Sequence, residues 1–232
     1  MTTITFGDLA FELRHSPHRR TVGITVERDG KLILTSPPAV SIETLEKIIN
    51  QKRYWIYNKL LRKESYSVPE KVKEYVCGEK FYYLGRSYSV KLVDTVKQQP
   101  PLRLYQSRFE LQRHAQTQGS EYFIHWYKQH LSPILEPKIA ALTNKIGATP
   151  RSIQVRELGY HWGSCGHQGN LYFHWRVAML PQHLIEYVVV HEMVHLLEPH
   201  HNHDFWDRVE GILPYYQDCK RDLAEQGAKY SL

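Results

Sequence analysis

The 232-residue sequence contains only three cysteines, Cys77, Cys165 and Cys219, and they lie far apart. An odd number of distant thiols suits neither a disulfide framework nor a CxxC metal site, so we expect reduced thiols. No apolar run approaches the roughly 18 residues that a membrane-spanning helix needs. Asp8 and Glu12 also interrupt the N-terminal stretch where a signal peptide would be apolar. These absences predict a soluble, cytoplasmic protein with no membrane partner.

The sequence also lacks low-complexity tracts, evident internal repeats and any large excess of charge. The chain has 30 Lys and Arg against 24 Asp and Glu, a formal net charge of +6. Its hydrophobic fraction of 42% and charged fraction of 23% are those of an ordinary globular chain, which excludes disordered, collagen-like and coiled-coil proteins. The first 100 residues hold 17 Lys and Arg against 11 Asp and Glu, so the positive excess lies there.

The chain before residue 113 is rich in β-like segments. The stretch from Ile4 to Leu34 consists of short β-like segments. Two of them, residues 21–26 and 31–34, flank the turn signal Asp29-Gly30, which predicts a hairpin. A helix is predicted over residues 41–63 and further strands over residues 79–111. We therefore expect a β-rich N-terminal region over residues 1–112 that contains one basic helix.

The predicted helix over residues 41–63 combines cations with aromatic rings on its polar face. Cations neutralise phosphates and rings stack on bases, so this face is a hypothetical contact for nucleic acid or nucleotides. A solvated amphipathic helix has the same pattern, and both interpretations stay open. The residues concerned are Lys47, Lys52, Arg53, Tyr54, Tyr57, Lys59, Arg62 and Lys63.

A long helical pattern follows residue 112. Apolar residues from Tyr122 to Leu142 recur at helical spacing. Pro133 and Pro137 lie inside this pattern, and proline removes a helical hydrogen bond and clashes with the preceding turn. The pattern therefore predicts either a kinked helix or a broken pair of helices.

Two strands and a further helix are expected after the proline-containing segment. The strands are predicted over residues 153–158 and 171–179, joined by a loop over residues 163–169. If the second strand lies at the edge of its sheet, an extended peptide could pair with it. The next helix begins near Pro181, and its residues are strongly apolar.

The helix that begins near Pro181 contains His191-Glu192-Met193-Val194-His195, an HExxH pattern. Histidines four residues apart lie on one face of a helix, so both imidazoles can bind one ion. The intervening Glu192 can reach a water molecule on that ion. Nine of the 14 histidines fall between His161 and His203, which also favours metal chemistry.

A hydrolytic zinc site needs three protein ligands and one open position, so a third ligand must follow the HExxH helix. Pro199 ends the helix and lets the chain turn back. His201 then lies six residues after His195, the three-histidine spacing of metzincins, and is the favoured third ligand. Two neighbouring histidines compete for that role: His200 and His203.

A short amphipathic helix is expected directly after the third histidine. Asn202 is a suitable N-cap residue for it. Its apolar stripe is expected to pack under the site as core rather than to bind a ligand. The stripe consists of Phe205, Trp206, Val209 and Leu213.

The second half of the sequence resembles the YgjP-like metallopeptidase family. The residues that carry the resemblance are His161-Trp162-Gly163-Ser164-Cys165, Gly169-Asn170-Leu171, Arg176, Leu180-Pro181, the HExxH helix, His201 and Phe205-Trp206. The match is specific from Val155 to Tyr216 and extends less specifically over the N-terminal region. SprT-type proteases are a more distant analogy.

The resemblance implies a zincin-like α+β fold over residues 113–232, either as a separate catalytic domain or continuous with residues 1–112. It also implies that His191, His195 and His201 hold Zn²⁺ and that Glu192 is the general base for a polypeptide substrate. The family commonly has Arg before Trp-Gly-Ser-Cys, whereas this chain has Tyr160-His161. The oxyanion-stabilising residue therefore stays open among Tyr160, His161, Arg176 and Tyr215.

Several functions fit these residues. The favoured one is a zinc-dependent metallopeptidase, in which a zinc-activated water attacks the peptide bond. The alternative keeps the metal site but hydrolyses nucleotides, as a nucleoside triphosphate pyrophosphatase or phosphohydrolase, although the chain has no Walker A pattern or acidic di-metal cluster. A nucleic-acid-associated protease using the basic helix is a third hypothesis. A purely structural zinc site is weakest, because such sites favour cysteine and a fourth ligand.

Overall fold

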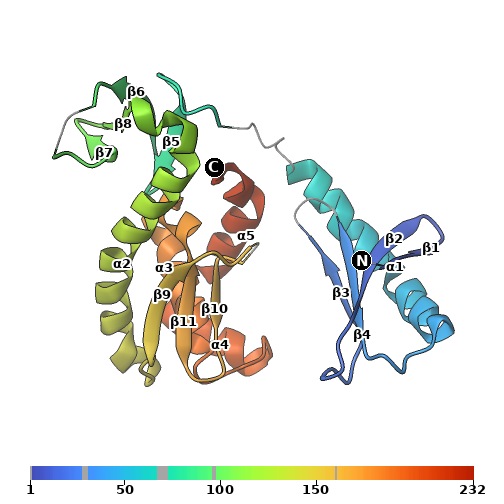
Figure 1. The fold of residues 1–232 in the computed structure, drawn as a ribbon. Helices are drawn as coiled ribbons and strands as arrows, with labels where there is room; N and C mark the ends of the chain where they lie inside the picture. The colour runs from blue at the N-terminus through green and yellow to red at the C-terminus, as the bar shows by residue number, and fades with distance from the viewer. Residues whose placement is uncertain (1, 28–30, 67–72, 96–97, 160) are drawn as a thin grey trace. The chain divides into compact units, whose positions relative to one another are not determined.

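The computed structural model describes residues 2–27, 31–66, 73–95, 98–159 and 161–232. The chain divides into two compact units, Met1–Pro69 (unit 1) and Glu70–Leu232 (unit 2) (Figure 1). Both units combine strands and helices without regular alternation, which confirms the predicted α+β class. Among the described residues, no helix is both long and apolar enough to cross a membrane.

Unit 1 is a four-stranded sheet followed by one long helix. Its elements are β1 (Thr2–Phe6), β2 (Leu9–His15), β3 (Gly23–Val26), β4 (Leu32–Ser36) and α1 (Ile42–Tyr66). The strand order is β1-β2-β4-β3, with β2 and β4 parallel to each other and both outer strands antiparallel to their neighbours. Strands β3 and β4 form the predicted hairpin, whose turn at Asp29-Gly30 lies outside the described residues.

Helix α1 begins where the sequence predicts, because Ser41 caps it: the Ser41 Oγ accepts a hydrogen bond from the Thr44 amide at 3.3 Å. One apolar stripe of α1 packs on the sheet of unit 1. The buried core of this unit consists of Phe6, Leu9, Phe11, Leu32, Leu34, Leu45, Ile49 and Ile56.

Unit 2 begins with a second four-stranded sheet. Its strands are β5 (Lys80–Tyr83), β6 (Arg86–Val93), β7 (Leu102–Tyr105) and β8 (Arg108–Gln112). The order is β5-β6-β8-β7, with β6 and β8 parallel. The sheet of unit 1 has the same strand order. The same strand arrangement therefore occurs twice in the chain, although the sequence shows no evident internal repeat.

The β5–β8 sheet shares its core with the long helix that follows it, α2 (Gly119–Ile146). Phe81 of β5 stacks on Phe123 of α2 with ring centroids 4.1 Å apart. Phe109 of β8 meets Phe123 and Trp126 edge to face. The compact units divide at Pro69, while the extent of the catalytic domain expected from sequence, residues 113–232 or one domain continuous with residues 1–112, stays a prediction. Composition shows which segments are β-rich but not which of them share a core.

Helix α2 is continuous through Pro133 and Pro137, so the predicted alternative of a broken pair is wrong. Each proline leaves unbonded the carbonyl four residues before it, at Gln129 and Pro133. Gln129, Pro133 and Pro137 are all exposed, so these carbonyls can bond to water. The opposite face of α2 is buried along its length, and this packing holds the helix together. A 3₁₀ helix, η1 (Arg113–Gln118), precedes α2.

The third sheet corrects two sequence predictions. Its strands are β9 (Ser152–Arg156), β10 (Gly163–Cys165) and β11 (Asn170–His174), in the order β10-β11-β9. Strand β11 lies in the middle, so the edge position that peptide pairing there would need is not met, while β10 lies at the edge within the predicted loop. Residues 175–179, predicted as strand, form a 3₁₀ helix, η2 (Trp175–Met179).

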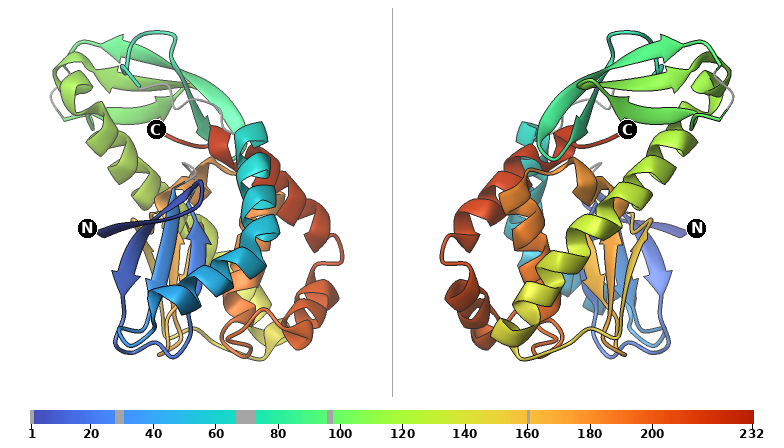
Figure 2. Two further views of the ribbon diagram at one scale, coloured as in Figure 1. Left: turned by 90° about the vertical axis from the view of Figure 1, so that its right-hand side faces the viewer. Right: turned by 90° about the vertical axis from the view of Figure 1, so that its left-hand side faces the viewer.

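The remaining elements are α3 (Gln182–Val194), α4 (His203–Ile212), α5 (Tyr216–Gln226) and the short η3 (Gly227–Lys229). Helix α3 contacts α2, α4, α5 and β10, and it is buried around most of its circumference. Figure 2 shows α2 running past α3 from the β5–β8 sheet to the β9–β11 sheet. This packing explains the strongly apolar sequence before HExxH.

Candidate metal centre

The end of α3 brings the three predicted histidine ligands together. His191 and His195 lie one turn apart on α3, and the loop after it returns His201 to them. The Nε2 atom of His201 lies 2.9 Å from that of His191 and 3.1 Å from that of His195. Helix α3 already ends at Val194, and Glu198 bonds back to the Val194 carbonyl at 3.0 Å before Pro199.

The spacing of these nitrogens fits a metal ion. Ligand nitrogens about 2.0–2.1 Å from a tetrahedral zinc lie about 3.3–3.4 Å from one another, slightly more than observed here. The Nδ1 of His195 lies 2.9 Å from the Glu198 carbonyl oxygen, which can only accept. Nδ1 of the neutral ring therefore carries the proton, and the lone pair of Nε2 is directed at the other two histidines.

Burial favours the neutral imidazole at two of the three candidate ligands. It lowers the pKa of His191 to about 3, with smaller contributions from His195, His201 and Lys220. Burial, followed by His195 and Lys220, also lowers the pKa of His201. Neutral imidazole is the form that binds metals. The Nδ1 of His191 is buried and has no hydrogen-bond partner among the described residues.

Glu192 lies beside this cluster on α3 and is almost completely buried, with 6% of its surface exposed. Burial raises the pKa of its carboxyl group to about 8. Its side chain packs on the backbone of Gly163 in β10: a Cβ atom built at residue 163 would lie 2.5 Å from the Glu192 Cγ and 2.7 Å from its Oε1. The edge strand therefore adjoins the predicted general base.

Helix α4 supplies an aromatic wall for the three histidines. The buried ring of Phe205 contacts all of them, with ring centroids 4.6–5.0 Å apart. Trp206 stacks on His201 at 5.6 Å and is only partly buried, so this member of the predicted core stripe belongs to the site. Asn202 caps α4 as predicted, since its Oδ1 accepts a hydrogen bond from the Phe205 amide at 2.9 Å.

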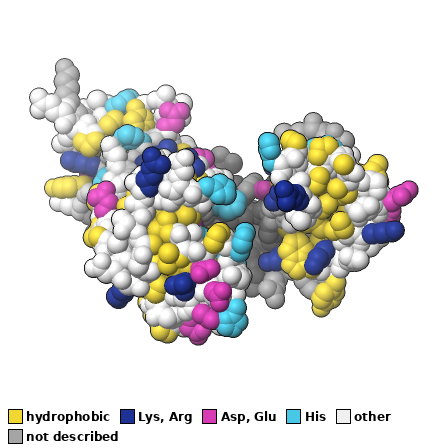
Figure 3. Space-filling view, turned by 90° about the horizontal axis from the view of Figure 1, so that it is seen from below, with side chains coloured by type: hydrophobic (Ala, Val, Ile, Leu, Met, Phe, Trp, Pro, Cys, Tyr) yellow, Lys and Arg dark blue, Asp and Glu magenta, His cyan; other side chains and the backbone are white. Residues whose placement is uncertain are grey.

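The two competing histidines lie outside the cluster. His200 and His203 are exposed, and neither joins the group formed by the three Nε2 atoms. His203 pairs instead with Asp207 one turn later, at 2.5 Å, in an exposed group that also includes Asp204. In the view of Figure 3, several histidine side chains lie at the surface of unit 2.

The structure assigns no oxyanion-stabilising residue. Tyr160 lies outside the described residues. His161 is exposed, and 47% of Tyr215 is exposed. The guanidinium of Arg176 lies 5.4 Å from the ring centroid of Trp175. Among the described residues, no hydrogen bond or ring contact joins these three side chains to the three histidines.

The predicted nucleic-acid face of α1 stays a prediction. Lys47, Lys52 and Lys59 are exposed, as is the ring of Tyr54. Arg53, by contrast, pairs with Asp8 of unit 1 at 2.5 Å and so serves the fold. The side chains of Arg62 and Lys63 lie outside the described residues.

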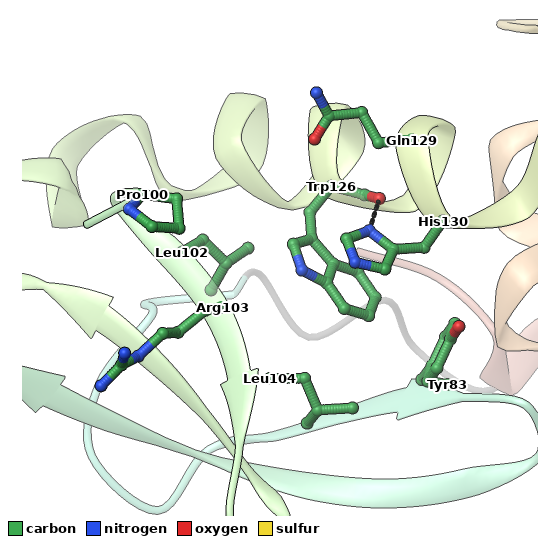
Figure 4. Close-up of a pocket in the computed structure, with 8 residues that line it drawn as sticks. All are labelled: Tyr83, Pro100, Leu102, Arg103, Leu104, Trp126, Gln129 and His130. Carbon is green, nitrogen blue, oxygen red and sulfur yellow. Dashed lines mark hydrogen bonds between the residues drawn. The ribbon is translucent and has the colours of Figure 1, made fainter. Parts of the chain in front are cut away.

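A separate hollow of about 330 Å³ lies between β7 and α2 (Figure 4). Its wall includes the stacked rings of Trp126 and His130, whose centroids are 3.8 Å apart, and the ring of Tyr83. Its lining contains one imidazole and no carboxylate or thiol, so it offers no set of metal ligands.

A cluster of three imidazoles beside a buried glutamate, carried on an HExxH helix of an α+β fold, is typical of metallopeptidases. The sequence matches the family model of the YgjP-like metallopeptidase domain over residues 20–226. The chain therefore belongs to the YgjP-like metallopeptidase family, whose members are peptidases that use a divalent metal.

Two further comparisons complete this result. A crystal structure of the metallopeptidase zymogen abylysin from Pyrococcus abyssi is similar to 40% of this chain and to 95% of its own length, with 19% identity and a TM-score of 0.37. No curated protein matches the sequence significantly.

Proposed function

We propose that the protein is a zinc-dependent peptidase in which His191, His195 and His201 hold the metal and Glu192 is the general base. The convergence of three imidazoles, with the His201 Nε2 2.9–3.1 Å from the other two Nε2 atoms beside a buried carboxyl group, carries this proposal. Imidazole nitrogens in a three-ligand set suit zinc and leave one position open for catalysis.

Each group has a distinct role in this proposal. A bound zinc ion would supply Lewis-acid activation of water and of the scissile carbonyl. The three histidines hold that ion through Nε2, and the Glu198 carbonyl orients His195 through Nδ1. A carboxylate oxygen of Glu192 accepts the proton of the attacking water and then donates it to the leaving amine. The apolar surroundings of Glu192 raise the pKa of its carboxyl group, so its carboxylate is a stronger base in the first transfer.

The polypeptide substrate is proposed to pair with β10. In the described residues β10 pairs only with β11, so the other edge of its backbone has no strand partner there. An extended peptide added there would gain main-chain hydrogen bonds and would lie beside Glu192, which packs on Gly163. The sequence allowed such pairing at the second predicted strand only if that strand lay at an edge, and the proposal moves it to β10.

The test compares metal-analysed wild type with Glu192→Gln, each offered an unstructured protein and, separately, nucleoside triphosphates. We expect one zinc per chain in both proteins and a loss of peptide cleavage of about 10²- to 10⁴-fold in Glu192→Gln. Glu186→Gln, on the same helix, is the matched control and should cleave normally. Phosphate or pyrophosphate release with intact polypeptide would establish nucleotide hydrolysis instead, and wild type without stoichiometric metal would refute both.

A further inference from the structure

Lys220 of α5 is a cation held near the metal centre. Its Nζ lies 4.1 Å from the ring centroid of Trp206, and the same indole stacks on the imidazole of His201 with the two planes 22° apart. Tyr216, one turn before Lys220 on α5, also stacks on Trp206, at 5.3 Å. A cation–π contact and a fixed indole therefore hold the ammonium group beside a metal ligand.

Lys220 differs from the neighbouring cations because it has no acidic partner among the described residues. The next residue, Arg221, pairs with Asp218 at 2.6 Å. Arg208 of α4 pairs with Glu198 at 3.2 Å. Lys220 is also exposed, so a negatively charged group from outside the chain can reach its ammonium group.

Ring contacts place Lys220 near the metal centre. Its ammonium group contacts the Trp206 ring, and that ring stacks on the imidazole of His201. One indole therefore separates the cation from a proposed metal ligand, so a group bound to Lys220 lies close to the proposed reaction site.

We propose that Lys220 determines specificity by binding a carboxylate of the polypeptide substrate, a role that rests on the peptidase function proposed above. The carboxylate belongs either to an acidic side chain close to the scissile bond or to the C-terminus of the peptide. An ammonium group is a compact point charge with three donors, so it accepts either source. The partial exposure of the contact limits the preference to roughly three- to tenfold at moderate salt.

The test measures kcat/KM of the zinc-loaded full chain on matched peptides. One series carries Glu or Gln at each position around the cleaved bond, and a second ends in a free carboxylate or an amide. Wild type should prefer the charged member of one series about three- to tenfold, mainly through KM, and the preference should fall as salt rises. The series that shows the preference identifies the source of the carboxylate.

Substitutions at Lys220 separate recognition from structure. Lys220→Met keeps an apolar stem on Trp206. It should reduce the ratio of kcat/KM for the charged peptide to that for the neutral peptide to about 1. Lys220→Arg should retain the ratio, and Lys220→Glu should invert it towards Lys-containing peptides. Lys145→Met changes an exposed lysine in the last turn of α2 and should leave the ratio unchanged.

Three outcomes would overturn the inference or its basis. Equal ratios in wild type, Lys220→Met and Lys220→Glu would refute a role for Lys220 while leaving the peptidase intact. A preference that Lys145→Met also removes would make it a general effect of net charge. The third outcome is that zinc-loaded wild type cleaves no peptide and hydrolyses triphosphates, with weaker hydrolysis in Lys220→Met. This result would refute the peptidase function and show that Lys220 binds a phosphate group.

Discussion

The backbone of Gly163 occupies the space beside the Glu192 side chain so closely that no other residue fits there without displacing the glutamate. A Cβ atom at residue 163 would lie 2.5 Å from the Glu192 Cγ and 2.8 Å from its Cδ. The glycine of Trp-Gly-Ser-Cys is therefore required by contact with the HExxH helix. Through this contact, the edge strand β10 lies directly beside Glu192, the proposed proton acceptor.

Gly163→Ala tests this contact. The added methyl group should push the Glu192 carboxylate out of place and reduce peptide hydrolysis by about 100-fold, as expected for a misplacement near 1 Å. Zinc content, measured by metal analysis, should not change, because the three atoms nearest to the added methyl group all belong to Glu192. Gly211→Ala is the control: nothing lies within 4 Å of its added Cβ in α4, so activity should persist. Normal activity of Gly163→Ala would contradict the proposed role of Glu192.

Phe205→Ala should loosen all three histidines together, because this ring contacts each of them. Removal of a buried phenyl ring costs about 3–5 kcal/mol of the free energy of unfolding. Zinc affinity, measured by competition with a chelator, should fall by about 10- to 100-fold. Phe109→Ala truncates an equally buried ring in β8. It should lower the free energy of unfolding by a similar amount without weakening zinc binding. Equal zinc affinities for the two variants would show that Phe205 only fills space.

Asn202→Ala removes the cap of α4 next to His201. The lost hydrogen bond to the Phe205 amide should lower the free energy of unfolding by about 1 kcal/mol. We also expect weaker zinc binding, because the start of α4 sets the direction of the chain at His201. Asn202→Asp can accept the same hydrogen bond and should restore both properties. Denaturant titration and chelator competition measure them, and failure of Asn202→Asp to rescue would argue against a capping role.

The stability of unit 1 should depend on pH through Glu12. Hydrogen bonds from Arg14 and then Lys31 lower the pKa of this buried carboxyl group from 4.5 to about 2. Because the folded pKa is below the unfolded one, the stabilisation is complete above about pH 4.5 and disappears as the pH falls towards 2. Hydrogen exchange of β2 amides should show that Glu12→Gln destabilises unit 1 at pH 7 and has little effect near pH 2. An effect that is the same at both pH values would exclude this ion pair as its cause.

The histidine cluster was predictable because helical geometry alone brings His191 and His195 to one face. Pro199 indicated that the chain must leave the helix, and the spacing favoured His201 over its neighbours. The cap at Asn202 follows from residue type. Each of these features depends on residues close in sequence, so no knowledge of distant contacts was needed.

The features missed from sequence all depend on long-range packing. Gly163, Ser164 and Cys165 have no strand pattern, and β10 exists because β11 pairs with it. Trp206 follows the same apolar spacing as its buried neighbours, and only the position of His201 makes it part of the site. In the sequence, nothing distinguishes Lys220 from the other lysines. Only the packing of α5 beside α4 brings its ammonium group to Trp206. The continuity of α2 through two prolines likewise depends on the core that its other face joins.

The shared strand order of β1–β4 and β5–β8, each followed by a long helix, makes unit 1 and the start of unit 2 two examples of one architectural module. The correspondence extends to contacts, since α1 lies against β3 and α2 against the equivalent strand β7. Everything needed for the proposed chemistry follows the second module. The first module has its own core and carries none of the proposed ligands, so it can diverge in sequence with little consequence for catalysis. We expect members of the family to differ most in this module, where a change of binding partner would leave the metal centre intact.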